Sequence, residues 1–271
     1  METTMTAHSG GPSRIDTTVP HSARIWNYWL GGKDNYEVDR VAGDAFQQAS
    51  PGIDVDARAG RYFLVRTIRY LAGEAGVRQF LDVGTGLPTV DNTHQVAQRE
   101  APESRIVYVD NDPLVLLHAQ ALLTSTPQGA TRYIDADLAD PESIIASAAG
   151  LLDLSRPVGL ILSGILGHVT DYDEARSIVR RLLKGLPSGS YLSLHDAPDT
   201  DPERAAAQDQ YNRTGAVPYI LRTPEQIAGY FDGLEIVEPG IVRIPLWRPD
   251  LAGADADVSA SVGIGGVGRL P

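Results

Sequence analysis

Cysteine is absent from the 271-residue sequence. Its absence excludes disulfide scaffolds, thiolate zinc sites, iron–sulfur clusters and a cysteine nucleophile. Basic residues are also few, because 23 Lys and Arg stand against 35 Asp and Glu, which gives a formal net charge of -12. A general nucleic-acid binder needs a positively charged surface, so we expect no nucleic-acid partner.

Long hydrophobic runs are missing as well. The longest apolar stretch, residues 158–169, is interrupted by Ser163, Gly164 and Gly167 and is too short to cross a bilayer. No basic segment and no apolar leader follow Met1. We therefore expect a cytoplasmic protein that has no membrane partner and is long enough to bury a proper core.

The chain divides into three parts by its composition and by the spacing of its apolar residues. Residues 1–19 are rich in Thr, Ser and Gly without periodicity, which predicts a disordered tail. Over 20–75, apolar residues recur at helical spacing in segments separated by Gly31-Gly32 and Pro51-Gly52, which predicts an N-terminal helical cap. Residues 76–271 are predicted to form a single domain.

Within 76–271, short apolar runs alternate with helical patterns. The predicted strands are residues 79–83, 105–109, 131–134, 158–162, 191–194, 234–244 and 261–267. The predicted helices are residues 89–100, a segment ending at 123, and 141–149, 173–184, 203–212 and 224–231. This alternation is typical of an α/β fold with a mostly parallel sheet and right-handed crossovers.

A glycine-rich turn follows the first predicted strand. Gly84 and Gly86 allow the backbone to approach a ligand at the carboxyl edge of the sheet. The dinucleotide fingerprint places a third glycine where this chain has Thr89, and Pro88 removes an N–H donor that a pyrophosphate would use. Asp82 suits a cation better than a pyrophosphate. These features favour an adenosine compound with an ammonium or sulfonium group, such as S-adenosylmethionine.

The next two strand ends are also acidic. Asp110 follows the second strand and can accept hydrogen bonds from ribose hydroxyls. Asp137 follows the third strand and can accept from an adenine amino group, with Leu138 against the ring. An ordinary turn or helix cap is the alternative for any one of these aspartates.

Three longer blocks resemble one known family. They are residues 20–36 with Asn27-Tyr28-Trp29-Leu30-Gly31-Gly32-Lys33-Asp34-Asn35-Tyr36, residues 79–89, and residues 107–113. They resemble a bacterial S-adenosyl methyltransferase family formerly carried as a domain of unknown function, within the class I S-adenosylmethionine-dependent methyltransferases. The similarity covers about 16–271 and includes the Pro239-Gly240 and Trp247-Arg248-Pro249 blocks.

The resemblance implies a Rossmann-like, seven-stranded, mostly parallel sheet whose last strand is antiparallel, and it implies bound S-adenosylmethionine. It also suggests that Gly31-Gly32-Lys33-Asp34-Asn35 folds over the cofactor. The predicted cofactor-binding residues are Asp82, Gly84, Thr85, Gly86, Asp110, Asn111, Asp137, Leu138, Ser163, Gly32, Asn35 and Arg61.

Several further residues have two interpretations. His168 and His195 follow the fourth and fifth strands, so each is either a catalytic base or a structural histidine. Arg58 and Arg61 share a helix face. One of them could bind the cofactor's carboxylate, or they could belong to a solvated face or form salt bridges to surface acids. The aromatic residues Trp26, Tyr28, Trp29 and Tyr36 could line a substrate pocket or pack in a core. No metal-binding spacing is present.

The sequence thus predicts an S-adenosylmethionine-dependent methyltransferase with a small-molecule acceptor that it does not identify. A protein that binds S-adenosylmethionine or S-adenosylhomocysteine without transferase activity is the alternative. A nicotinamide-dependent oxidoreductase is a third hypothesis, against which Pro88 and Thr89 count.

Overall fold

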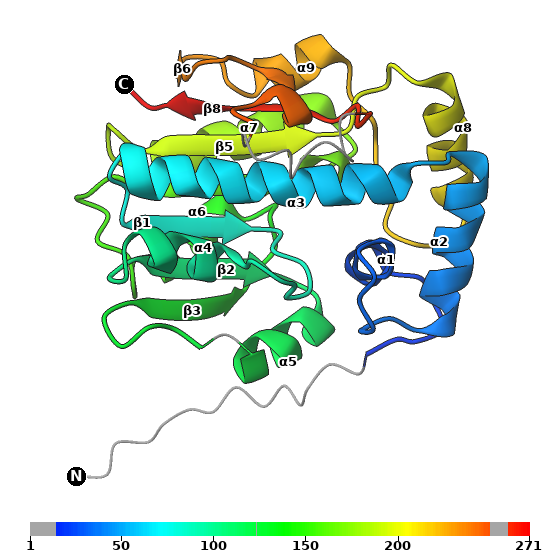
Figure 1. Cartoon of the computed structure of the whole chain (residues 1–271), viewed down its shortest axis with the longest axis horizontal. Helices are drawn as coiled ribbons and strands as arrows, with labels where there is room; N and C mark the ends of the chain where they lie inside the picture. Colours follow the sequence, from blue (N-terminus) through cyan, green and yellow to red (C-terminus); the bar gives the residue numbers. More distant parts are fainter. Residues whose placement is uncertain (1–14, 123, 250–259) are drawn as a thin grey trace.

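The structure is a computed structural model that describes residues 15–122, 124–249 and 260–271. One sheet of eight strands has the order β3-β2-β1-β4-β5-β8-β6, and β7 also pairs with β8 (Figure 1). The strands are β1 (Gln79–Val83), β2 (Arg105–Asp110), β3 (Ala130–Asp135), β4 (Gly159–Ser163), β5 (Tyr191–Asp196), β6 (Glu235–Ile236), β7 (Val242–Arg243) and β8 (Ile264–Arg269).

The sheet confirms the expected class I arrangement. Strands β1 to β5 pair in parallel, and β8 runs antiparallel to β5. The single strand predicted over 234–244 was wrong. It forms as the two short strands β6 and β7, because the chain turns between them at Gly240, which has a φ of 105°. Both strands pair with β8.

The helices follow the predicted pattern with one clear difference. They are α1 (Ser22–Trp29), α2 (Glu37–Ala49), α3 (Ile53–Arg69), α4 (Thr93–Glu100), α5 (Pro113–Leu122), α6 (Pro141–Ala148), α7 (Tyr172–Lys184), α8 (Pro202–Tyr211) and α9 (Pro224–Gly229). Helix α4 begins at Thr93 and not at Thr89, because Asn92 and Gln95 form a reciprocal capping box. Pro88 therefore lies in the loop before the helix.

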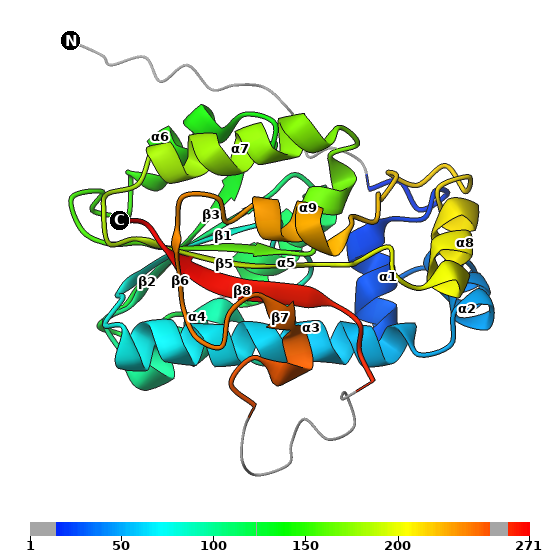
Figure 2. The ribbon, with the colours of Figure 1, turned by 90° about the horizontal axis from the view of Figure 1, so that it is seen from above.

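Helices cover both faces of the sheet (Figure 2). On one face, Ile144 of α6 and Ile178 of α7 pack in a core cluster with residues of β1, β2, β4 and β5. On the other face, Phe63 and Ile68 of α3 pack in a second cluster with Phe80 of β1. The structure therefore places α3 on the sheet, although its position before the first strand had suggested the cap.

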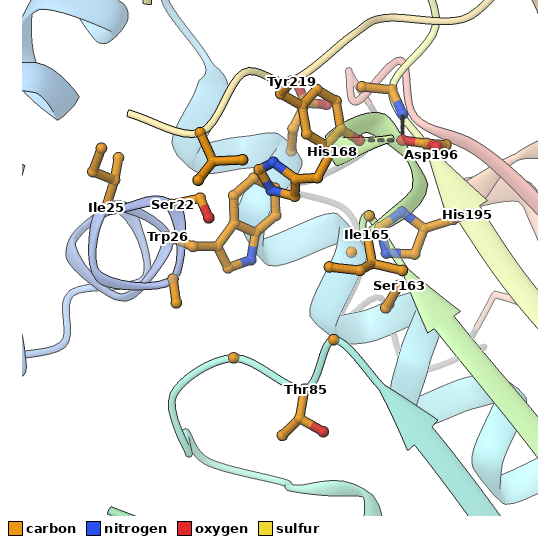
Figure 3. A pocket seen from close by; sticks show the side chains of 18 of the residues that line it. Ser22, Ile25, Trp26, Thr85, Ser163, Ile165, His168, His195, Asp196 and Tyr219 are labelled. Atoms are coloured by element: carbon orange, nitrogen blue, oxygen red, sulfur yellow. Dashed lines mark hydrogen bonds between the residues drawn. The ribbon is translucent and has the colours of Figure 1, made fainter. Parts of the chain in front are cut away.

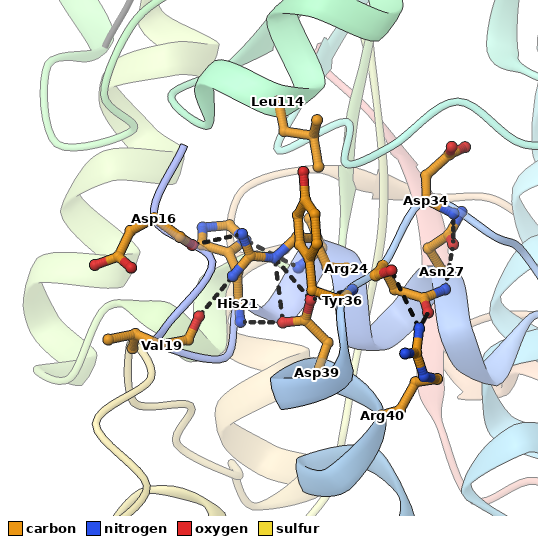
Figure 4. Close-up of polar contacts among 12 residues, drawn as sticks. Asp16, Val19, His21, Arg24, Asn27, Asp34, Tyr36, Asp39, Arg40 and Leu114 are labelled. Atoms are coloured by element: carbon orange, nitrogen blue, oxygen red, sulfur yellow. Dashed lines mark hydrogen bonds and ion pairs between the residues drawn. The ribbon is translucent and has the colours of Figure 1, made fainter. Parts of the chain in front are cut away.

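Helices α1, α2 and α8 stand together at the carboxyl ends of the parallel strands (Figure 1). Arg24 of α1 and Asp39 of α2 form a buried ion pair with a distance of 3.0 Å between Nε and Oδ2. Asp39 also accepts hydrogen bonds from the backbone N–H groups of His21 and Tyr36 (Figure 4). This pair joins the two cap helices.

The expected tail contacts this cap in part. Arg24 donates hydrogen bonds to the carbonyl oxygens of Asp16 and Val19, so residues 15–19 follow the cap surface. Residues 1–14 of the predicted tail lie outside the described residues. In the described ranges, no helix has both the length and the apolar character that a membrane span requires.

Candidate functional site

A cavity of about 710 Å³ opens where the parallel strands end and the cap begins. Ligands bind at this edge of open α/β sheets, and the volume is in the usual range for ligand pockets. The lining includes the predicted residues Arg61, Asp82, Gly84, Thr85, Gly86, Asp110, Asn111, Asp137, Leu138 and Ser163. The sheet topology thus brings together residues that are far apart in the sequence.

Two of the predicted residues, Gly32 and Asn35, do not line the cavity. The Asn35 Nδ2 donates to Asn27 Oδ1 and to the Gly32 carbonyl, at 3.0 Å each. A Cβ atom on Gly32 would lie 2.3 Å from Asn27 Nδ2. Both residues therefore shape the turn after α1 and hold Asn27, which does line the cavity.

The two glycines of the turn after β1 have different roles. Both have a positive φ, 75° at Gly84 and 65° at Gly86, a conformation that strongly favours glycine. A Cβ on Gly84 would lie 2.4 Å from Ile165 Cγ1, whereas a Cβ on Gly86 would meet no heavy atom within 4 Å. Gly84 thus permits close packing, and Gly86 leaves space for a ligand.

Asp82 is a buried carboxylate at the floor of the cavity. Its Oδ2 accepts a hydrogen bond from Thr93 Oγ1 at 2.5 Å. Burial raises the pKa of Asp82 to about 6, and the nearby Asp110 adds to this effect, while the Thr93 hydrogen bond and Arg61 oppose it. A ligand with a positive charge would therefore stabilise the ionised form of this side chain.

The Asp110 carboxylate is oriented by backbone donors. Its Oδ2 accepts from Gly86 N at 2.8 Å, and its Oδ1 accepts from the N–H groups of Asn111 and Asp112 at 2.9 and 3.0 Å. Burial raises its pKa. Because a carboxylate has about four acceptor directions, Asp110 can still accept a hydrogen bond from a ligand hydroxyl.

Asp137 and Leu138 lie at the rim of the same cavity. The Asp137 Oδ1 accepts from Ala139 N at 2.9 Å, and Leu138 packs against the core of the sheet. The carboxylate and the apolar side chain thus stand beside one another, as the recognition of a purine edge and face would require.

Arg61 and Arg58 have different surroundings in the structure. Arg58 pairs with Asp54 at 2.9 Å and does not line the cavity. Arg61 lines it and donates through Nη2 to the carbonyl oxygens of Val90 and Asp91 at 3.3 and 2.9 Å. Its buried Nε lacks a hydrogen-bond partner among the described residues. Of these two arginines, Arg61 is the one that borders the cavity.

His195 is buried in the cavity wall next to the end of β4 (Figure 3). It pairs in register with Ser163, and its ring meets Phe63 edge to face with the ring centroids 5.5 Å apart. Within the part of the chain that the structure describes, neither ring nitrogen has a hydrogen-bond partner. Burial, together with Arg61, lowers the pKa of His195 to about 4, so the imidazole is neutral at neutral pH.

His168 is held more firmly than His195. Its Nδ1 lies 3.0 Å from the Pro218 carbonyl oxygen, and its ring stands edge to face against Tyr219 with centroids 5.1 Å apart. Burial lowers its pKa. The contact to Pro218 fits a structural role for His168, although it also lines the cavity.

Sequence reasoning missed an acid and its tyrosine partner in the cavity wall. Asp196 follows His195 and accepts a hydrogen bond from the Tyr219 hydroxyl. Burial raises the pKa of Asp196 to about 6. The strand-end position gave a signal for Asp196, but no pattern in the sequence indicated Tyr219, which reaches the site from the loop after α8.

Two of the four aromatic residues that the sequence suggested for a substrate pocket line the cavity, and two do not. Trp26 and Trp29 line the cavity, and Tyr28 and Tyr36 do not. The Tyr28 hydroxyl donates to Asp44 at 2.6 Å, and Tyr36 carries the Arg24 guanidinium over its ring at 5.2 Å from the centroid. The sequence could not separate them, because helical spacing is the same for a core face and for a pocket wall.

The chain is similar in sequence and in fold to known proteins. A profile of a family described as S-adenosyl methyltransferase matches residues 8–271. The structure of a DUF574 family protein from Streptomyces avermitilis MA-4680 is 47% identical with a TM-score of 0.89, and the match covers 95% of this chain and 100% of that one. A candidate methyltransferase from Thermobifida fusca YX is 40% identical with a TM-score of 0.84, over 94% of this chain and 97% of that one.

A more distant structure shows the fold alone. The mitomycin 7-O-methyltransferase MmcR is 15% identical with a TM-score of 0.50, over 92% of this chain and 68% of that one. A search of curated proteins finds no match. The family profile spans nearly the whole sequence, and the resemblance of the three sequence blocks is confirmed. The chain belongs to the S-adenosyl methyltransferase family.

Proposed function

We propose that this protein binds S-adenosylmethionine in the cavity at the strand ends and transfers its methyl group to a small molecule held under the cap. The observation that carries the proposal is the arrangement of Asp82, Arg61 and Asp110 around one cavity next to a glycine turn. These side chains offer an anion for an ammonium group, a cation for a carboxylate and an acceptor for ribose.

The residues fit this cofactor chemically. Asp82 is a buried acid that forms no ion pair among the described residues, although the charge of Arg61 lies near it. The Nε of Arg61 is a buried donor without a hydrogen-bond acceptor in the described ranges. An amino-acid group carries both complementary charges. Asp137 and Leu138 would take the adenine, and Asn111, Thr85 and Ser163 would complete the contacts.

Bound S-adenosylmethionine supplies an electrophilic methyl carbon, whose bond to sulfur breaks with the electron pair going to sulfur. The protein's part is to align the acceptor atom with that carbon and to accept the acceptor's proton, because positioning provides much of the rate in such a displacement. We assign the proton to a ring nitrogen of His195, which is neutral and without a partner among the described residues. His168 would position the loop that carries Tyr219.

The experiment that tests this function follows the methyl group. The purified protein is incubated with methyl-labelled S-adenosylmethionine and the small-molecule fraction of a cell extract. The proposal expects label in a compound other than the cofactor and its breakdown products. If the protein binds the cofactor and no label leaves it, the protein is a binding module and not a transferase.

Replacing Arg61 by methionine should weaken the binding of S-adenosylhomocysteine by roughly tenfold to a hundredfold, because a hydrogen bond to a charged group contributes about 1.5–3 kcal/mol. The binding of 5′-methylthioadenosine, which lacks the amino-acid group, should change by less than about twofold. Isothermal titration of both ligands measures this difference. Arg58→Met is the matched control on the same helix. Equal losses for both ligands would contradict the role of Arg61.

The binding of S-adenosylhomocysteine should weaken as the pH falls through about 6. The folded pKa of Asp82 is raised to about 6, so the carboxylate that would attract the ammonium group is present above this pH and is lost below it. The loss should approach tenfold per pH unit. Titrations over a pH series check this, and Asp82→Asn should flatten the profile. A 5′-methylthioadenosine profile of equal steepness would assign the effect to another carboxyl group.

A further inference from the structure

A continuous aromatic wall lines the part of the cavity under the cap. Trp26 and Trp29 of α1 meet edge to face with ring centroids 5.7 Å apart. Trp29 lies 5.3 Å from Phe46 of α2, and Phe46 lies 6.3 Å from Tyr211 of α8. All four side chains line the cavity. We call the space that they border, together with Asp56 and Arg204, the cap chamber.

The wall has a free aromatic surface. Trp26 is 36% exposed although it lines the cavity, and in Figure 3 its indole extends from the cap helix into the site. A partly uncovered tryptophan in a concave site favours a ligand that stacks against it. Further apolar side chains of the lining, Ile25, Ile53 and Leu221, extend this surface.

The charged side chains of the cap chamber are already paired. Asp56 of α3 forms an ion pair with Arg204 of α8, and both are buried. Asp56 Oδ1 also accepts from Val262 N at 3.1 Å. A charged ligand that enters here loses its hydration and gains no ionic partner from this pair, which makes its burial unfavourable.

The wall next to the chamber adds one acidic side chain, Asp196, which lies near a cation. Asp196 accepts the hydrogen bond from Tyr219 through Oδ1, and its buried Oδ2 has no hydrogen-bond partner among the described residues. The positive charge of Arg222 lies near this carboxylate. His168 and His195 are neutral at neutral pH, since burial lowers the pKa of each. In contrast, the cofactor end of the cavity contains Arg61, Asp82 and Asp110. The cavity thus has one charged end and one aromatic end, where Asp56 is paired with Arg204 and Asp196 lies near Arg222.

We propose that the methyl acceptor is an uncharged molecule with an aromatic ring body, which stacks in the cap chamber and presents an O–H or N–H group to His195. This inference rests on the proposed function, because it assigns the second half of the same cavity. The acceptor's oxygen or nitrogen forms the bond to the methyl carbon as the carbon–sulfur bond breaks, and its proton passes to His195.

Four matched probes test the acceptor class with the full chain saturated with S-adenosylhomocysteine. They are 2-naphthol, the anionic 6-hydroxy-2-naphthoate, the cationic 6-(aminomethyl)-2-naphthol and the non-aromatic decahydro-2-naphthol. We expect calorimetry to show that 2-naphthol binds on the order of a hundredfold more tightly than either charged probe. It should bind about fivefold to tenfold more tightly than decahydro-2-naphthol, because ring stacking adds to area burial.

A variant pair locates the binding. Trp26→Leu should weaken 2-naphthol about tenfold and leave decahydro-2-naphthol within about twofold. Tyr28→Leu is the matched control, because Tyr28 is an aromatic residue of the same helix that lies outside the lining. It should leave the affinity of all four probes unchanged. Melting temperatures of both variants verify that the fold is intact.

The outcomes separate this inference from the proposed function. A charged probe that binds as tightly as 2-naphthol overturns the inference, and so does the absence of binding by all four probes while S-adenosylhomocysteine binds. An unchanged 2-naphthol affinity in Trp26→Leu overturns it as well. If S-adenosylhomocysteine itself does not bind the wild-type chain, the proposed function fails first.

Discussion

Replacing Asp110 by alanine should weaken the binding of S-adenosylhomocysteine on the order of a hundredfold. The carboxylate would accept a hydrogen bond from the ribose, and a bond to a charged group contributes about 1.5–3 kcal/mol. The substitution also removes the acceptor that holds the N–H groups of Gly86, Asn111 and Asp112. The glycine turn would thus lose its anchor together with the ligand contact. Calorimetric titration of the purified variant measures this effect.

Asp135→Ala is the control for this prediction. Asp135 is the register partner of Asp110 at the end of β3, but it does not line the cavity. Its replacement should leave the affinity within about twofold. Asp110→Asn, which preserves the size of the side chain, should show most of the loss of Asp110→Ala. Undiminished binding in both Asp110 variants would refute the assignment of this residue to the cofactor.

Replacing Asp39 by alanine should destabilise the fold by about 3–5 kcal/mol, because it leaves the buried guanidinium of Arg24 without its partner. The backbone N–H groups of His21 and Tyr36 also lose their acceptor. For a domain of this size the melting temperature should fall by about 10 °C. Thermal unfolding followed by circular dichroism measures the change.

An exposed pair on the same helix provides the comparison. Arg40 and Glu37 lie 2.6 Å apart at the surface, and such pairs contribute about 0–1 kcal/mol. Arg40→Met should therefore leave the melting temperature nearly unchanged. Asp39→Asn keeps an acceptor oxygen and should fall between the two. If Asp39→Ala melts no earlier than Arg40→Met, the buried pair does not hold the cap together.

The sheet end of the cavity could be predicted from the sequence, because short sequence patterns determine where the strands end and which residues follow them. The alternation of strands and helices predicts that the strands end at one edge of the sheet. The turn residues after these strands predict glycines with a positive φ and acidic side chains at that edge. Asp82, Gly86 and Asp110 were therefore predicted to lie together, and the structure places them around one cavity. Their binding of the cofactor stays a prediction.

The cap end was not predictable in the same way. The Asp56 and Arg204 pair joins helices that are far apart in the sequence. No sequence pattern in either helix indicates which residue of the other helix it will pair with. Tyr219 reaches Asp196 from a loop without periodicity. Helical spacing placed α3 in the cap, whereas its side chains pack in one core cluster with Phe80 of the sheet. Gly32 and Asn35 matched a motif, and in the fold they support Asn27.

In the proposed function, the charged end of the cavity binds an adenosyl amino acid. The most direct test is a calorimetric titration of the full wild-type chain with S-adenosylhomocysteine, with NADH titrated in parallel. We expect saturable heat at one site for S-adenosylhomocysteine, a rise in melting temperature and no binding of NADH. No heat and no thermal shift at millimolar S-adenosylhomocysteine, or tighter binding of NADH, would contradict it.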